Sequence, residues 1–124
     1  MNIVVSFYSK EPMYEQILNQ IKELILTGKL EANEQLPSIR QLAKDLKVSV
    51  TTVKKAYEEL ERQGIIATLH GRGSFITDIN IDEIKEKNIK TVTEKLKEIK
   101  DFSIVCGIEK EELKNIIDKL YEGE

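Results

Sequence analysis

The sequence contains little of what several classes of protein depend on, with one cysteine, one histidine and no tryptophan in 124 residues. A single cysteine excludes an internal disulfide framework, and Cys106 with His70 cannot supply the four or so ligands of a structural zinc site. Apolar runs such as residues 3–5 fall far short of the roughly 20 residues that span a membrane. The first residues also lack the basic start and apolar stretch of a secretory signal, so we expect a cytoplasmic protein with no membrane partner.

Motifs of catalysis are missing as well. A catalytic nucleophile needs a base beside it, whereas the lone thiol and the lone imidazole lie in different segments. Residues 70–73 (HGRG) superficially resemble a phosphate-binding loop, but no helical pattern follows them. Most acidic residues alternate with lysines in the pattern of a solvated helix face. We therefore expect no enzyme activity, no cofactor and no metal site.

The net charge of −3 and a pI near 5.4 argue against a nucleic-acid partner if the charge is evenly spread. It is not evenly spread. Residues 1–78 contain ten basic and ten acidic residues, so the whole acidic excess lies after Asp78. Within residues 38–57, five basic residues stand against Asp45 alone. This local charge of +4 fits either a solvated helix face or a surface that binds phosphates.

Hydrophobic periodicity predicts three helices in the first half of the chain. One starts near Met13, with Pro12 in its first turn, and stops at Gly28. The second starts at a capping box formed by Ser38 and Gln41, with the Gln41 side chain reaching back to Ser38. It carries apolar residues on one face, namely Ile39, Leu42, Ala43 and Leu46.

The third helix is capped by Ser49 and ends at Gln63 and Gly64. Its inward positions are Val53, Ala56, Tyr57 and Leu60. Two segments rich in β-branched residues follow, 65–69 and 74–77, and predict a hairpin around the tip 70–73. Two short helices joined by a tight turn and followed by such a wing describe a winged helix-turn-helix. We therefore predict a mainly α fold with a small β wing, in which residues 11–78 form a DNA-binding domain.

Residues 79–124 predict two more helices, 82–106 and 109–121, separated by Gly107. The first carries an apolar row that Ser103 interrupts, consisting of Ile89, Val92, Leu96, Ile99 and Cys106. The second turns its own apolar row inward, consisting of Leu113, Ile116, Ile117 and Leu120. Two such helices are too thin to form a core, so we predict a dimerisation segment in which Cys106 is buried in the row. The alternative is that both helices fold back on the winged domain of the same chain.

The exposed side of the third helix has the residue types that read a major groove. If Val53 and Tyr57 point inward, then Val50, Thr51, Lys54, Lys55 and Glu58 point outward. Lysines pair with phosphate or guanine, threonine hydroxyls bind phosphate, and valine packs on a thymine methyl group.

Three further positions join the candidate site. Arg40, near the start of the preceding helix, can reach phosphate or guanine, and the amides at the Ser49 helix start form an anion site. At the hairpin tip, Arg72 suits a narrow minor groove. Each signal has a plain alternative, since the Thr51–Thr52 pair fits an ordinary helix start and His70 an exposed turn.

Seven segments together resemble the DNA-binding domain of the GntR family of transcription regulators. They are residues 12–17 (PMYEQI), 24–30 (LILTGKL), 36–43 (LPSIRQLA), 48–53 (VSVTTV), 57–61 (YEELE), 64–65 (GI) and 71–75 (GRGSF). The match runs without gaps from Glu11 to about Thr77. The short tail around residues 107–113 (GIEKEEL) is similar to the YtrA-like subfamily, whereas larger members carry an effector-binding domain there.

The resemblance implies a homodimeric bacterial regulator, usually a repressor, that binds a pseudo-palindromic operator in double-stranded DNA. It places DNA contacts at Arg40, Ser49, Thr51, Thr52, Lys54, His70 and Gly71. Many members have a guanine-reading arginine where this chain has Val50, so that position is expected to make apolar contact or read shape. The subfamily is often linked to transporter operons.

Two other functions stay open on the sequence alone. One is a winged-helix protein-interaction module, with the Lys- and Glu-rich helices as a scaffold. The other is a regulator gated by a small-molecule effector, which the sequence does not identify. The tail is too short to enclose a drug-sized cavity in one subunit, so any effector pocket would be shallow or shared between subunits.

Overall fold

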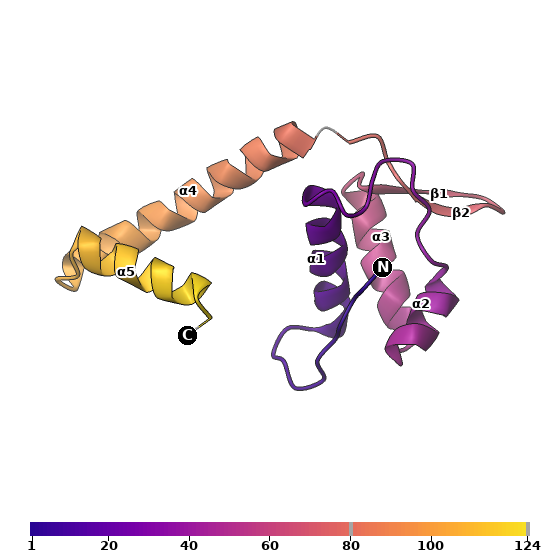
Figure 1. Cartoon of the computed structure of the whole chain (residues 1–124), viewed down its shortest axis with the longest axis horizontal. Helices are drawn as coiled ribbons and strands as arrows, with labels where there is room; N and C mark the ends of the chain where they lie inside the picture. Colours follow the sequence, from indigo (N-terminus) through magenta and orange to yellow (C-terminus); the bar gives the residue numbers. More distant parts are fainter. Residues whose placement is uncertain (80, 124) are drawn as a thin grey trace. The chain divides into compact units, whose positions relative to one another are not determined.

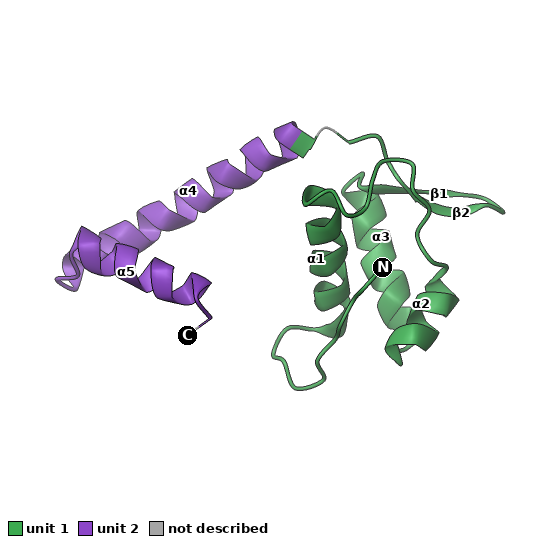
Figure 2. Cartoon of the chain, in the orientation of Figure 1, with its two compact units in different colours: residues 1–81 green, residues 82–124 purple. Residues whose placement is uncertain are grey.

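The computed structural model describes residues 1–79 and 81–123 (Figure 1). These residues form five helices and two strands, in the order α1 (Met13–Leu26), α2 (Ile39–Leu46), α3 (Val50–Arg62), β1 (Ile66–Leu69), β2 (Gly73–Ile76), α4 (Ile81–Val105) and α5 (Lys110–Tyr121). The chain divides into two compact units, residues 1–81 and 82–124 (Figure 2). The mainly helical fold with one small antiparallel wing confirms the predicted fold class.

The helix ends follow the local signals, with one exception. Pro12 directly precedes α1, and Gly28 adopts a left-handed φ of 78° just after its end. The Ser38 Oγ atom accepts a hydrogen bond of 3.1 Å from the Gln41 amide, as expected of an N-cap. The reciprocal half of the predicted capping box is wrong, because the Gln41 side chain donates to Asp45 Oδ1 instead, at 2.7 Å. Asp45 lies one turn further along the same helix face, where a charged acceptor competes with the backbone.

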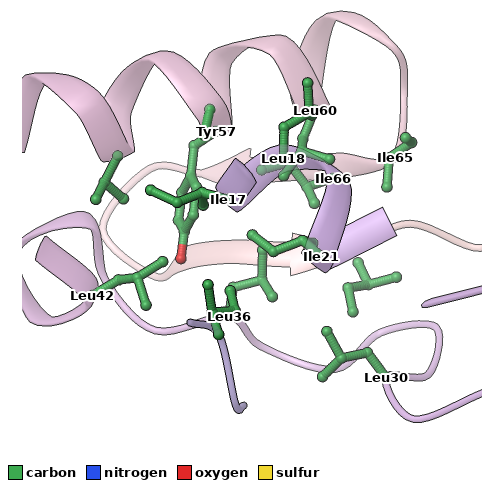
Figure 3. Close-up of a cluster of buried hydrophobic side chains, with 14 of the residues drawn as sticks. Ile17, Leu18, Ile21, Leu30, Leu36, Leu42, Tyr57, Leu60, Ile65 and Ile66 are labelled. Carbon is green, nitrogen blue, oxygen red and sulfur yellow. The ribbon is translucent and has the colours of Figure 1, made fainter. Parts of the chain in front are cut away.

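The core of the first unit is formed where α1 and α2 pack against α3 (Figure 3). All four predicted inward residues of α3 are buried, and α1 contributes Ile17 and Ile21, which are fully buried. The buried Tyr57 ring places its hydroxyl 2.7 Å from the Pro37 carbonyl, to which it donates a hydrogen bond. This bond fixes the segment that leads into α2 against the middle of α3.

The wing is a hairpin with a third segment alongside it. β1 and β2 pair antiparallel, in a register that runs from Ile66 opposite Ile76 to Leu69 opposite Gly73. Residues 33–36 follow β2 on its other side, with an isolated antiparallel bridge between Gln35 and Phe75. The Leu36 amide donates to the Ser74 carbonyl at 2.9 Å. The connection between α1 and α2 is thereby joined to the wing.

The N-terminal residues also belong to this unit, which the sequence did not indicate. Ile3 is buried with the core residues. The Gln20 side chain bonds both backbone groups of Val4, at 2.9 and 2.6 Å. Gln16, itself buried, does the same for Ser6, at 2.8 and 3.0 Å. Two glutamines of α1 thus hold the incoming chain as a neighbouring strand would.

The second unit consists of α4, α5 and the turn between them. Gly107 adopts a left-handed φ of 75°, and the Ile108 amide donates to the Ser103 carbonyl at 2.8 Å. Ser103, expected to interrupt the apolar row, is buried, whereas Cys106 lies just beyond α4 and is exposed. In the single chain Cys106 is exposed like the residues of the row within α4, so its burial between paired chains stays a prediction.

Most apolar side chains of the second unit are exposed. On α4 the exposed fractions are 55% for Ile89, 54% for Val92, 40% for Leu96 and 44% for Ile99. Ile116 and Leu120 of α5 are exposed too, and the described parts of α4 and α5 share no extended packing contact. None of the described helices combines the length and the apolarity that a membrane crossing requires.

Candidate nucleic-acid interface

The turn between α2 and α3 is closed by the backbone. Lys47 ends α2 with a left-handed φ of 57°, which directs the chain away from the helix axis. The Val48 amide then donates to the Ala43 carbonyl at 3.0 Å, and the half-buried Val48 side chain packs against the core. A tight turn of this kind leaves the first turn of α3 exposed.

The first turn of α3 is organised by Ser49. Its Oγ atom accepts a hydrogen bond of 3.1 Å from the Thr52 amide and lies 2.7 Å from the Thr52 Oγ1 atom. Ser49 and Thr52 therefore form one hydrogen-bonded cap. Val50 and Thr51 are exposed, Val50 to 47%. The free amides and the positive end of the helix dipole favour an anion at this point.

The two neighbouring lysines of α3 point in different directions. The Lys54 ammonium lies 3.9 Å from Glu58, in an exposed pair of the kind that contributes little to stability. The Lys55 ammonium lies 4.0 Å from the centroid of the Tyr14 ring on α1, in a cation–π contact. Lys55 thus lines an open cleft of about 670 Å³ between α1 and α3. Lys54 keeps its charge on the exposed side of α3.

Arg40 lies at the start of α2 and is exposed. Its guanidinium makes no hydrogen bond or ion pair with any residue in the described part of the chain. It follows shortly after Pro37, which Tyr57 anchors, so the start of α2 lies against the middle of α3. An unpaired cation held on a fixed helix start is available to a phosphate or a base.

The wing tip consists of His70, Gly71 and Arg72, all exposed. The Arg72 amide donates to the Leu69 carbonyl at 2.9 Å, which closes the turn. Gly71 adopts a left-handed φ of 75°, a conformation that side-chain-bearing residues rarely take. Neither the imidazole nor the Arg72 guanidinium has a partner among the described residues.

Four titratable groups of the first unit have shifted pKa values, one of which is Arg62, whose pKa its hydrogen bond to Glu59 raises. Burial raises the pKa of the Tyr57 hydroxyl, and a hydrogen bond to Glu15 raises the pKa of Tyr14. Hydrogen bonds from Arg62, and then from Gln63, lower the pKa of Glu59 to about 2. These groups lie along the α1–α3 contact and in the core. Their pKa shifts reflect local hydrogen bonds and burial there, and none of these groups belongs to the exposed first turn of α3.

The predicted site residues therefore lie at three places in the first unit. The start of α2 presents Arg40, the first turns of α3 present Ser49, Val50, Thr51, Thr52 and Lys54, and the wing tip presents His70, Gly71 and Arg72. Lys55 lies apart from them, against Tyr14. The sequence reasoning did not identify Gln35, whose side chain donates to the Arg72 carbonyl at the wing tip. It placed Tyr57 in the core but did not foresee the hydrogen bond from its hydroxyl to the Pro37 carbonyl, just before α2.

Two helices joined by a closed turn, an exposed second helix and a hairpin wing define a winged helix-turn-helix DNA-binding domain. The model of the bacterial regulatory proteins of the gntR family matches residues 13–76, and the chain belongs to this family. It is thus a DNA-binding transcription regulator and not an enzyme.

Similar proteins cover most of the chain. It is 40% identical over 112 residues to the HTH-type transcriptional repressor YtrA of Bacillus subtilis, a match that covers 90% of this chain and 86% of YtrA. A GntR family transcriptional regulator from Listeria monocytogenes superposes with a TM-score of 0.72 at 35% identity, covering 91% of this chain and 98% of that one. The DNA-binding domain of AraR, solved in complex with an operator, matches 62% of this chain and 96% of its own length, with a TM-score of 0.55 at 25% identity.

Proposed function

We propose that this chain is a cytoplasmic repressor that binds a pseudo-palindromic operator in double-stranded DNA as a homodimer. The observation that carries the proposal is the exposed, Ser49-capped first turn of α3, with the unpaired Arg40 guanidinium at the start of the helix before it. The name of the similar YtrA protein, a transcriptional repressor, supports the direction of regulation. Repression then follows from competition with RNA polymerase at a promoter.

In this proposal α3 enters the major groove. Val50 packs against a thymine methyl group, Thr51 and the Ser49–Thr52 cap bind phosphate, and Lys54 exchanges its weak pair with Glu58 for phosphate or guanine. Lys55 instead contacts the Tyr14 ring of α1, so we assign it no DNA contact. The wing tip, with His70, Gly71 and Arg72, follows the adjacent minor groove.

We further propose that residues 11–78 bind DNA and residues 79–124 pair two chains. The support is the apolar row of α4, whose spacing of three and four residues is that of a helix seam, together with its exposure in the single chain. Soluble monomers rarely expose contiguous apolar patches of this kind. A second copy that covers the row with its own also sets the separation of the two recognition helices.

The DNA-binding proposal is tested with operators selected from a pool of random duplexes by the full-length chain, followed by gel-shift titrations. Arg40→Ala is expected to weaken operator binding by about 1–3 kcal/mol. Lys10→Ala, which removes an exposed positive charge outside the three places, is the matched control and is expected to bind as the parent does. Binding that weakens steeply with salt supports phosphate contact. No shift at micromolar protein contradicts the proposal and favours a protein-interaction module.

The dimer is tested by sedimentation equilibrium. The full chain is expected to be a dimer, and the chain truncated after Asp78 a monomer. Arg40→Ala is expected to leave the dimer intact, because Arg40 lies outside residues 79–124. A truncated chain that still dimerises contradicts the assignment of residues 79–124 to pairing.

A further inference from the structure

We propose that Gln35 is a positioning residue for DNA binding, whose side chain holds the wing tip in place while itself making no DNA contact. The Gln35 Nε2 atom donates a hydrogen bond of 2.8 Å to the Arg72 carbonyl, across 37 residues of chain. This inference rests on the proposed function, in which the wing tip follows a minor groove. Gln35 is not one of the DNA-contacting residues that the resemblance to the GntR family implies.

The position of Gln35 is fixed by the backbone on both sides. Gln35 forms an antiparallel bridge with Phe75 of β2. On one side the Ile76 amide donates to the Glu34 carbonyl, and on the other the Leu36 amide donates to the Ser74 carbonyl, both at 2.9 Å. These backbone bonds hold the Gln35 Cα atom beside the hairpin, from where its side chain reaches the Arg72 carbonyl at the tip.

The tip has few other restraints. The last strand pair joins Leu69 to Gly73, so His70, Gly71 and Arg72 lie beyond the ladder. In the described part of the chain, the Arg72 amide bond to Leu69 and the Gln35 bond to the Arg72 carbonyl are the hydrogen bonds that hold the tip backbone beyond these pairs. Loss of the Gln35 bond leaves only the bond within the turn itself.

Gly73 provides the space in which the Gln35 amide lies. Its φ of 109° is strained for any residue with a side chain, and a Cβ atom built there would lie 2.7 Å from the Gln35 Nε2 atom. Real Cβ atoms essentially never come this close to a neighbour. The Gly73 backbone and the Gln35 side chain are thus complementary, and a side chain at 73 displaces the amide from the Arg72 carbonyl.

The same segment connects the wing to the helix-turn-helix. Residue 36 pairs with β2, residue 37 accepts the Tyr57 hydrogen bond, and α2 begins two residues later with Arg40 close behind. Gln35 therefore lies between two of the proposed DNA-contacting places. Its side chain bonds the wing tip, and the chain that follows it leads directly into the start of α2. A hydrogen bond here fixes where the wing tip stands relative to α2 and α3.

The test uses the full-length chain and an operator selected from random duplexes. Gln35→Met keeps the length of the side chain and removes the donor, and it is expected to weaken operator binding about three- to tenfold. The matched control is Gln63→Met, at an exposed glutamine whose side-chain amide donates to Glu59, and it is expected to bind as the parent does. Hydroxyl-radical footprints of Gln35→Met are expected to lose protection at the outer minor grooves while the protection around the α3 contacts stays.

A double-mutant comparison separates positioning from direct contact. In a background that carries His70→Ala and Arg72→Ala, Gln35→Met is expected to change the affinity less than twofold, because the tip it positions no longer binds. Gly73→Ala in the parent background is expected to reproduce the altered footprint. An equal loss of affinity in both backgrounds overturns the proposal, since Gln35 would then act independently of the tip. Failure of the parent chain to bind any duplex refutes the proposed function, whereas parent-like binding by Gln35→Met refutes this inference alone.

Discussion

Replacing Tyr57 by phenylalanine is expected to lower the free energy of unfolding by about 1–2 kcal/mol at neutral pH. The ring stays in the core, but the 2.7 Å hydrogen bond to the Pro37 carbonyl is lost. The net contribution of a typical hydrogen bond to the free energy of unfolding is about 0.5–1.5 kcal/mol. The partly buried Pro37 carbonyl, left without its donor, adds to the loss. Since this bond connects α3 to the segment before α2, the effect falls on the arrangement of the two helices.

The same substitution has a second effect at alkaline pH. Burial raises the pKa of the Tyr57 hydroxyl above its ordinary value of 10.0. The folded chain therefore holds this proton more tightly than the unfolded chain, and the stability from Tyr57 is fully present below pH 10 and declines as the pH rises above it. The phenylalanine variant has no such proton, so the difference in stability between parent and variant is expected to shrink above pH 10.

The measurement is urea unfolding followed by circular dichroism at 222 nm, at pH 7.5 and pH 10.5. Tyr8→Phe is the matched control, because Tyr8 is 98% exposed, and it is expected to match the parent at both pH values. A Tyr57→Phe variant as stable as the parent at pH 7.5 refutes the role of the Pro37 bond. A difference that stays constant between the two pH values refutes the protonation argument.

Three further predictions concern the fold of the first unit. Ser49→Ala is expected to lower the free energy of unfolding by about 1 kcal/mol through loss of the N-cap, and an unchanged urea midpoint would contradict this. Ile21→Ala is expected to cost about 2–5 kcal/mol because Ile21 is fully buried, and a loss below about 1 kcal/mol in the same assay argues against its place in the core. Arg62→Gln is expected to raise the pKa of Glu59 from about 2 towards 4.5 in a carboxyl NMR titration, since Arg62 is its first hydrogen-bond donor. The contribution of Glu59 is present above about pH 4.5 and lost as the pH falls towards 2, so this variant is expected to lose less stability in acid than the parent, and an unshifted pKa contradicts the pairing.

The helices and the wing could be predicted from the sequence because their signals are local. Ser38 and Ser49 mark helix starts through bonds that span three residues, and Gly64 marks the end of α3. The apolar spacing of α3 likewise identified which side is buried and which side carries Lys54. Such patterns depend on neighbours within one or two turns, so the order of elements and the candidate recognition helix followed from them.

The remaining features depend on partners distant in the sequence. Nothing near Gln35 indicates that its side chain meets the Arg72 carbonyl, and nothing near Lys55 indicates a contact with the Tyr14 ring. The burial of Ile3 likewise depends on Gln16 and Gln20, whose amides hold the N-terminal backbone. Helical periodicity gives the side of a helix on which a residue lies, but it does not identify the neighbour that occupies that side.

The pairing of residues 33–36 with β2 affects the order in which the first unit folds during synthesis. Contacts between chain segments this far apart form only after the intervening loop has closed, and they form more slowly than the turns of a helix. Because synthesis runs from the N-terminus to the C-terminus, α2 and α3 leave the ribosome before the hairpin that completes the wing. A nascent chain that ends before β2 lacks the seated tip, so we expect tight operator binding only from chains in which the wing is complete. DNA that binds only the complete domain stabilises it relative to partly unfolded states. A regulator bound to its operator is therefore expected to unfold less often than a free one.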